Sequence, residues 1–217
     1  MSLLTNLVSY WKLDGNSTDG VGSNNGTDTS ITYSAGNGKI VQGAGFNGSS
    51  SKIVFTSSAS LTPATFTISA WIYITGTPPN AYTIYGADVS YGGIVFKVDN
   101  SRKLAVDKSN MVNILAGTNL VPINQWVHVL CTYTTGTGVC NAYINGTLDK
   151  TTTNAQTFTQ VAQTIGKNWN EYFSGALDEV GLWNRALSAA EVTSLYNGGA
   201  GLAYPFTGNK SNFFQFM

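Results

Sequence analysis

Residues 175–199 read GALDEVGLWNRALSAAEVTSLYNGG, and this stretch decides the fold. It predicts one strand followed directly by one short helix. Ser188 is placed to cap the helix, and Glu191 three residues later completes a reciprocal capping box. Leu187 and Val192 can form the hydrophobic contact that often accompanies such a cap. Val192, Leu195 and Tyr196 then share one helical face, and Gly198 is placed to end the helix in a left-handed conformation.

The rest of the chain carries strand signals. The segments at 66–74 and 126–133 alternate apolar and polar residues, and shorter strands are expected at 8–13, 40–46, 53–55, 84–85, 93–98, 104–107, 140–144, 161–165 and 175–183. Many short strands separated by turns predict an antiparallel sandwich. The predicted fold class is therefore all-β: a two-sheet antiparallel jelly-roll sandwich with one short C-terminal helix, at 188–197.

The composition of the chain argues against several classes of function. Only 10% of the 217 residues are charged, and 11 Lys and Arg balance 11 Asp and Glu. This balance lacks the basic footprint of a nucleic-acid-binding protein and the polybasic segment of a membrane anchor. There is no run of about 18 apolar residues, so we expect no membrane insertion. The first residues show neither a basic segment nor a long apolar core, so we expect no signal peptide.

Cys131 and Cys140 flank a predicted hairpin turn, and both fall on the apolar side of their strands. Two buried thiols are the favoured interpretation. A cross-strand disulfide is the alternative, and it depends on the register of the hairpin.

An ordered set of short motifs gives the chain a family resemblance. The motifs are YWKLDGN at 10–16 with Asp19, NGT at 25–27, GAGFNG at 43–48, IVF at 53–55, FTISAW at 66–71, WVHV at 126–129, YING at 143–146, IG at 165–166 and the closing strand and helix. Over residues 7–199 the chain resembles laminin-G-like, concanavalin A-like jelly-roll domains, in particular the pentraxin-related bacterial and phage branch. The resemblance implies two stacked antiparallel sheets.

The resemblance also implies a structural calcium ion between the first and last strands. By position, the chain offers Asp14 after the first strand and Asp178 entering the last, with a backbone carbonyl near Gly45 or Asn47. Such oxygen ligands suit calcium. The alternative is that Asp14 caps a turn and Asp178 accepts hydrogen bonds from nearby amides.

The calcium-bridged ligand site of the pentraxins is not expected in this chain. Oxygen ligands follow the Ile-Gly dipeptide in that branch, whereas here Ile165-Gly166 is followed by KNWNE at 167–171. A Lys and a Trp stand where oxygen ligands are needed.

Aromatic and amide residues favour sugar recognition instead. Sugars stack on aromatic rings and hydrogen-bond to amides and carboxylates. The predicted ligand contacts are Asn168, Trp169, Asn170 and Tyr172 of one loop, with Tyr85 and Asp88. Trp71, Tyr73, His128 and Tyr143 could form a second aromatic platform on the outward face of their strands, unless loops or the 188–197 helix cover it.

Catalysis is not expected. A glycoside hydrolase of this fold needs two carboxylates on one face of a strand, and no two of the eleven acids lie two or four positions apart in a predicted strand. Asp178 and Glu179 are adjacent and should point to opposite faces. His128, the only histidine, has no nucleophile motif beside it.

We therefore predict a sandwich domain over residues 1–203 and a C-terminal tail over 204–217, for which an added strand is favoured over a sticky or disordered end. The predicted function is a non-catalytic binding or adhesion module that recognises a glycan or cell-surface polysaccharide through edge loops, with a structural calcium. The alternative is a structural or host-attachment component of a virus (phage) particle, with viral structural proteins as partners; a glycoside hydrolase is less favoured. Either of the first two roles predicts an extracellular or virion-associated protein.

Overall fold

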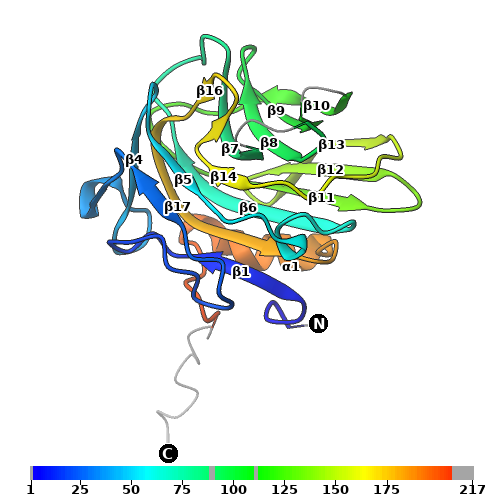
Figure 1. Cartoon of the computed structure of the whole chain (residues 1–217), viewed down its shortest axis with the longest axis horizontal. Helices are drawn as coiled ribbons and strands as arrows, with labels where there is room; N and C mark the ends of the chain where they lie inside the picture. Colours follow the sequence, from blue (N-terminus) through cyan, green and yellow to red (C-terminus); the bar gives the residue numbers. More distant parts are fainter. Residues whose placement is uncertain (1, 88–90, 110–111, 207–217) are drawn as a thin grey trace, which may run out of the picture.

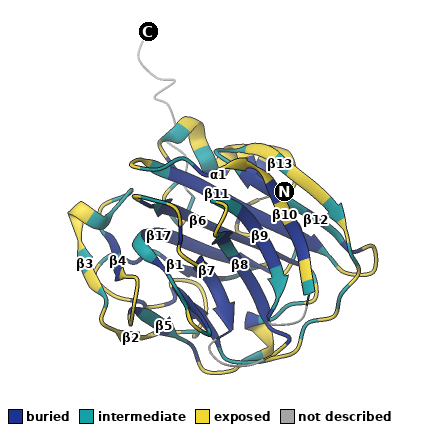
Figure 2. Ribbon diagram, turned by 90° about the horizontal axis from the view of Figure 1, so that it is seen from above, coloured by how far each residue is buried: buried dark blue, intermediate teal, exposed yellow. Residues whose placement is uncertain are grey.

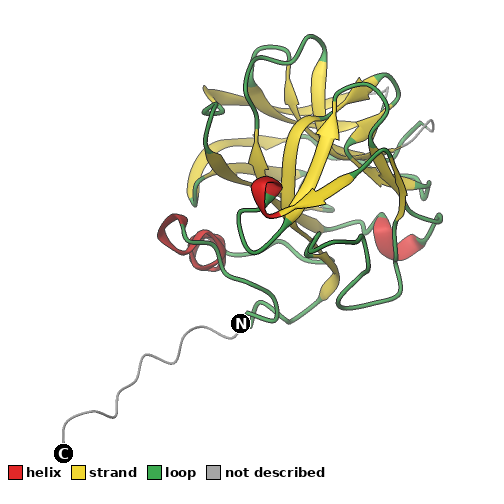
Figure 3. Cartoon of the chain, turned by 90° about the vertical axis from the view of Figure 1, so that its left-hand side faces the viewer, coloured by secondary structure: helices red, strands yellow, loops and turns green. Residues whose placement is uncertain are grey.

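The computed structural model describes residues 2–87, 91–109 and 112–206. Two antiparallel sheets stack face to face, and the short helices lie outside them (Figures 1 and 3). The first sheet has the order β13-β12-β11-β6-β17-β4-β3, and β1 also pairs with β17. The second has the order β10-β9-β8-β7-β14-β5-β2. The predicted fold class is confirmed.

The strands of the first sheet are β1 (Leu7–Trp11), β3 (Thr32–Ser34), β4 (Gly43–Asn47), β6 (Phe66–Tyr73), β11 (Trp126–Thr134), β12 (Val139–Ile144), β13 (Thr147–Thr153) and β17 (Ser174–Trp183). Those of the second are β2 (Thr27–Thr29), β5 (Lys52–Val54), β7 (Ala81–Ala87), β8 (Ile94–Asp99), β9 (Lys103–Lys108), β10 (Val112–Leu120) and β14 (Gln163–Ile165). A separate hairpin joins β15 (Lys167–Asn168) to β16 (Glu171–Tyr172). Three short 3₁₀ helices occupy Ala35–Asn37, Ala59–Leu61 and Asn197–Gly199.

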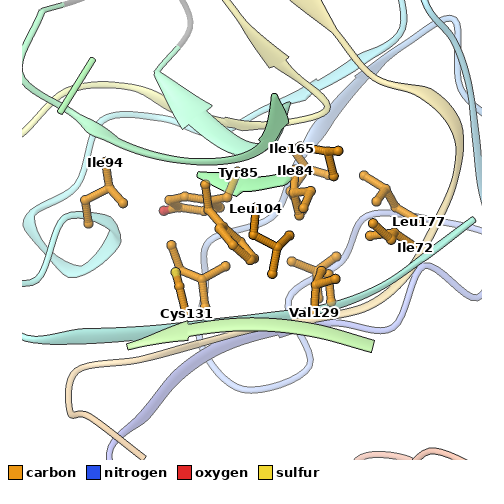
Figure 4. Close-up of a cluster of buried hydrophobic side chains, with 14 of the residues drawn as sticks. Ile72, Ile84, Tyr85, Ile94, Leu104, Val129, Cys131, Ile165 and Leu177 are labelled. Carbon is orange, nitrogen blue, oxygen red and sulfur yellow. The ribbon is translucent and has the colours of Figure 1, made fainter. Parts of the chain in front are cut away.

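The space between the sheets is filled by apolar side chains that alternate along the strands. In Figure 4, Ile72, Val129 and Leu177 of the first sheet face Ile84 and Leu104 of the second, and all five are 0% exposed. Burial is highest on the central strands and lowest at the edge strands β2, β3 and β13 (Figure 2). This interior is what holds the two layers together.

Both cysteines belong to this interior. Cys131 on β11 and Cys140 on β12 are free thiols and are fully buried. The favoured prediction of two buried thiols is confirmed, and the disulfide is not formed. Burial raises the pKa of the Cys131 thiol well above its usual value and that of Cys140 to about 12.

Helix α1 (Ala189–Tyr196) covers the outer face of the first sheet. Ser188 and Glu191 form the predicted capping box, and Val192 and Leu195 are buried. The helix ends at Asn197, with φ 48° and ψ 49°, so the left-handed residue that ends it is Asn197 rather than Gly198.

Trp71, His128 and Tyr143 of the predicted second aromatic platform lie under this helix, whereas Tyr73 is half-buried and packs against Trp126. Trp71 and His128 are 3% and 2% exposed, and Tyr196 stacks on Trp71 with ring centroids 5.9 Å apart. These rings are therefore packing residues. His128 shares a hydrogen bond of 2.8 Å with the Ser69 hydroxyl, and burial lowers its pKa to about 3.

The beginning of the predicted tail also packs on this face. Tyr204 stacks on Tyr10 at 5.2 Å, and Phe206 contacts Tyr10 edge-on at 5.2 Å. Residues 204–206 form a turn rather than an added strand. The packed unit thus extends at least to Phe206, and the tail prediction for 207–217 lies outside the described residues.

Candidate functional site

The β15–β16 hairpin lies on the outer face of the second sheet, against β7 (Figure 1). Two contacts fix it there. The Thr164 hydroxyl donates a hydrogen bond to the Lys167 carbonyl oxygen. Gly86 of β7 allows the close approach, because a Cβ at that position would lie 2.7 Å from the same carbonyl oxygen.

Trp169 stands at the tip of this hairpin in an unfavourable backbone conformation. Asn168 pairs with Glu171, so Trp169 and Asn170 form a two-residue turn, and Trp169 has φ 51°. Glycine normally takes such a position. The ring lies edge-on to Tyr91 at 5.2 Å, and its indole N–H is buried without an acceptor. Strain and an unsatisfied donor together suggest that Trp169 serves something other than stability.

A groove of about 340 Å³ runs beside the hairpin over the outer face of β8 and β9. Its floor is built by strand alternation: Ile94, Phe96 and Val98 point into the core, so Val95, Lys97 and Asp99 point outward. The lining residues are Val95, Lys97, Asp99, Ala105, Asp107, Lys108, Ser109, Val112, Asn113, Asn168 and Glu171.

The polar side chains of the groove form one connected network around Lys97. The Lys97 ammonium lies 3.0 Å from Asp107 Oδ2 and 2.8 Å from Glu171 Oε1. Asn113 Nδ2 donates to Asp107 Oδ1 at 2.7 Å, and Asn168 Nδ2 donates to Glu171 Oε2 at 3.1 Å. We call these five residues the Lys97 network.

Each member of the network is held by another, so the polar groups are fixed before any ligand arrives. Burial opposes the charge on Lys97, but Asp107 and Glu171 outweigh it and raise the pKa of the ammonium. Asn168, which is 4% exposed, also accepts a hydrogen bond of 3.0 Å from the Ser109 hydroxyl. Ser109 in turn accepts from the Gly92 N–H through its carbonyl, which places Tyr91 near this end of the groove.

The predicted ligand residues of the β15–β16 hairpin do not all face the same depression. Asn168 lines the groove and Trp169 forms the tip. Asn170 and Tyr172 line a second depression of about 250 Å³, together with Tyr82 and Asn80.

Tyr85 must be removed from the predicted site. Its ring is 0% exposed in the core, and its hydroxyl donates to the Leu61 carbonyl oxygen at 2.7 Å (Figure 4). A register shift between Thr83 and Tyr85 breaks the alternation of β7, so that Ile84 and Tyr85 both face the core, and no ligand at the surface could reach Tyr85. Asp88 lies outside the described residues.

Of the Lys97 network, the sequence interpretation named only Asn168 as a ligand contact and missed Lys97, Asp107, Asn113 and Glu171. The signal was present: Lys97 and Asp99 occupy alternate positions of one strand, and Asp107 is the last residue but one of the next. Alternation identifies the outward face, but only the pairing of β8 with β9 and the position of the hairpin bring Asp107 and Glu171 to the same ammonium.

Of the predicted metal residues, Asp14 follows β1, and Asp178 lies at a bulge in β17, where this strand changes its pairing from β4 to β1. Asp178 accepts three backbone N–H bonds, from Lys39 and Ile40 at 2.8 Å and from Glu179 at 2.9 Å. Asp14 bonds the Lys12 ammonium at 2.7 Å and the Gln42 N–H at 3.0 Å. Both carboxylates thus have partners within the protein, and a metal ion at Asp14 and Asp178 stays a prediction.

Glu179 differs from its neighbours. Its side chain is 2% exposed, its φ is 51°, and both carboxylate oxygens are buried without a hydrogen-bond partner. Burial raises its pKa to about 7, although nearby Tyr10 and Lys12 oppose the shift. In the described part of the chain, no three His, Cys, Asp or Glu side chains gather as a metal cluster. A cation here would need Glu179 together with backbone carbonyls.

Comparison with known structures shows the same fold. Domain 4 of AbnA, a GH43 extracellular arabinanase from Geobacillus stearothermophilus, in complex with arabinotriose, is 23% identical, with a TM-score of 0.71 over 87% of this chain and 97% of that domain. The binding domain of Paraclostridial Mosquitocidal Protein 1 is 18% identical, with a TM-score of 0.71 over 91% of this chain and 53% of that one. Trypanosoma rangeli sialidase in complex with sialic acid is 16% identical, with a TM-score of 0.69; the match covers 92% of this chain and 34% of the sialidase.

Comparison with curated protein sequences gives no match. A family model, however, matches residues 47–193, from the end of β4 into α1. That span includes the β15–β16 hairpin and all the strands that form the floor of the groove. This chain belongs to the family Laminin_G_3 of the concanavalin A-like lectin/glucanase superfamily.

Proposed function

We propose that this protein is a non-catalytic carbohydrate-binding module whose ligand lies in the groove beside the β15–β16 hairpin. Trp169 offers a ring for an apolar sugar face, and the Lys97 network offers fixed donors and acceptors for hydroxyl groups. A groove of about 340 Å³ falls within the range of small-molecule sites.

The observation that carries the proposal is Trp169. A Trp in a left-handed turn position costs roughly 1–3 kcal/mol of backbone strain. Trp169 is only half-buried, and it directly follows Asn168, which lines the preorganised polar groove. Preorganised polar groups beside an exposed aromatic ring reduce the ordering cost of binding a flexible polyol.

The structural relatives support a binding role. One similar domain was solved with arabinotriose, and another is described as a binding domain. The proposal extends to the location: a module that recognises cell-surface polysaccharide would work outside the cell or on a virion. None of the helices in the described part of the chain has the length and apolar character of a membrane span.

A glycan array followed by calorimetric titration of each hit tests this function. Trp169→Ala should weaken binding at least ~10-fold, which corresponds to about 1.4 kcal/mol. Trp126→Ala is the matched control, because Trp126 is also half-buried but lies on the first sheet. Unchanged affinity in Trp169→Ala, or equal losses in both variants, would contradict the assignment of the groove.

Two other functions have their own outcomes in the same experiments. An ordered oligomer without glycan hits would favour a structural or host-attachment role in a virus particle. Release of reducing sugar from β-glucans would favour a glycoside hydrolase, and we expect none. Asp107 and Glu171 do share the groove, but the Lys97 ammonium lies between them, where a glycosidic oxygen would have to sit.

We also propose that the structural calcium expected between the first and last strands is held by Glu179. Its buried oxygens have free lone pairs, whereas those of Asp14 and Asp178 are engaged. Calcium accepts carboxylate and backbone carbonyl oxygens, and it would offset the cost of burying this charge. Asp178 then acts as support that ties the loop at 39–40 to the bulge.

A further inference from the structure

The charges that line the groove are unequal. Three carboxylates, from Asp99, Asp107 and Glu171, stand against the ammonium groups of Lys97 and Lys108. The formal sum is therefore −1. No Arg, the side chain best suited to bidentate binding of carboxylate and sulfate, is among the described lining residues.

The arrangement within the network strengthens this imbalance. Lys97 is enclosed by two carboxylates, and its side chain is 14% exposed against 19% for Asp107 and 23% for Glu171. An approaching ligand thus meets acceptor oxygens more readily than the ammonium. A sugar hydroxyl can donate a hydrogen bond to these oxygens, whereas an ionised acidic group on a sugar cannot and is repelled by them.

We propose that this groove selects uncharged glycans and rejects acidic ones, such as uronic, sialic or sulfated sugars. This inference rests on the proposed function and names its ligand class. Repulsion of an acidic sugar by Asp107 and Glu171 should weaken its binding at least ~10-fold relative to the neutral sugar of the same linkage.

Matched oligosaccharide pairs give the test. Mannotetraose is compared with tetramannuronate, and galactotetraose with tetragalacturonate, by calorimetric titration of the unmodified protein; arabinotriose and sialyllactose are added as unmatched neutral and acidic probes. We expect affinity only in the neutral class. Any residual binding of an acidic probe should strengthen as sodium chloride rises from 20 to 500 mM, because salt screens the repulsion.

The double variant Asp107→Asn, Glu171→Gln reverses the formal charge of the groove from −1 to +1. It should bind the acidic member of each pair more tightly than the unmodified protein does. Asp28→Asn, Asp149→Asn is the control, because it changes the net charge equally but lies on β2 and β13, outside the groove. If the groove variant fails to fold, the effect of salt on the binding of acidic probes by the unmodified protein still tests the proposed repulsion.

The outcomes separate this inference from the proposed function. Tighter binding of the acidic members by the unmodified protein overturns the selection of uncharged glycans and leaves the carbohydrate-binding function in place. Equal binding of both members of each pair also overturns it. Binding of neither class contradicts the proposed function, and the inference falls with it.

Discussion

Burying the carboxylate of Glu179 costs free energy, and the packing of the rest of the fold offsets this cost. A carboxylate that is 2% exposed favours its protonated form, because burial penalises the charged one. Its pKa of about 7 in the folded protein lies well above its ordinary value of 4.5, so the folded state holds the proton more tightly than the unfolded chain does.

The sign of the pH dependence follows from this shift. Between about pH 4 and pH 8 the folded state binds more protons at Glu179, so stability falls as pH rises through this window, by up to about 3 kcal/mol. For a domain of this size that is roughly 6–12 °C in Tm. Glu179→Gln should remove this part of the slope and raise Tm at pH 8. Two other groups add slopes that both proteins share. His128, whose pKa burial lowers to about 3, adds one of opposite sign below about pH 6.5, and Asp178, whose pKa burial raises to about 8, adds one of the same sign, so the test is the difference in slope between the two proteins.

Calcium should have the complementary effect, because it binds the ionised carboxylate and stabilises the folded state by mass action. Thermal melts of metal-free protein at pH 8 should rise on adding calcium and fall again with excess EDTA. Glu179→Gln is the control and should not respond. A parallel slope in both proteins would contradict the buried-carboxylate argument, and equal melts with calcium and with EDTA would contradict the metal site.

At the scale of single elements, α1 depends on a small set of polar contacts at its beginning. Glu191 Oε2 accepts the Ser188 N–H at 2.9 Å, and the Arg185 guanidinium binds both Glu191 oxygens at 2.7 and 2.8 Å. Arg185 Nε also donates to the Thr5 carbonyl oxygen at 2.9 Å. The cap therefore ties the helix to the N-terminal segment as well as closing its first turn.

Two variants separate these contributions. Ser188→Ala should cost about 1 kcal/mol, as the loss of an N-cap usually does. Glu191→Ala should cost more, because it also leaves the guanidinium without its carboxylate. The Arg185 contact lowers the pKa of Glu191 to about 2, so its stabilisation is complete above about pH 4.5 and is lost as pH falls towards 2. Urea unfolding at pH 7 and pH 3 measures both effects; equal losses for the two variants at pH 7 would contradict the role of Arg185.

Helices and strands with a clear pattern in their own sequence could be predicted. Strands that form only because they pair with a neighbouring strand could not. The helix and the strands β6 and β11 were predicted within about a residue, because alternation and capping are local patterns. The edge strands β10 and β13 were missed. β13, TLDKTTT at 147–153, is polar apart from one leucine and carries no alternation of apolar residues, and in β10 the buried residues Ile114 and Leu115 are adjacent, so the alternation is broken. The segment expected as a strand at 40–46 begins instead at Gly43, because Asp178 holds residues 39 and 40 in a loop.

At the scale of the whole molecule, the same distinction applies to the candidate site. The hairpin residues Asn168 and Trp169 could be picked out because their composition is unusual. The Lys97 network joins residues 74 positions apart, and only sheet pairing and the packing of β15 against β7 bring them together. Tyr85 was misassigned for a related reason: simple alternation puts it on the same outward face as Thr83, and only the register shift between β7 and β8 turns its ring into the core.

The boundary of the domain gives the last test at this scale. The outer face of the first sheet is closed on one side by α1 and on the other by Tyr204 and Phe206, whose rings contact Tyr10 and Trp183. A chain that ends at Ala203 should expose the rings of Tyr10 and Trp183. Its free energy of unfolding should be lower by roughly 1–3 kcal/mol than that of a chain that ends at Phe206. It should also admit water to the neighbourhood of Glu179, which lies near the Tyr204 backbone, and so weaken the pH dependence of Tm. Melts of the two truncated chains between pH 5 and pH 8, with the full chain as reference, measure both effects. Identical curves for the two truncations would place the boundary at 203, as the sequence predicts, and would show that the aromatic contacts of residues 204–206 add nothing to the fold.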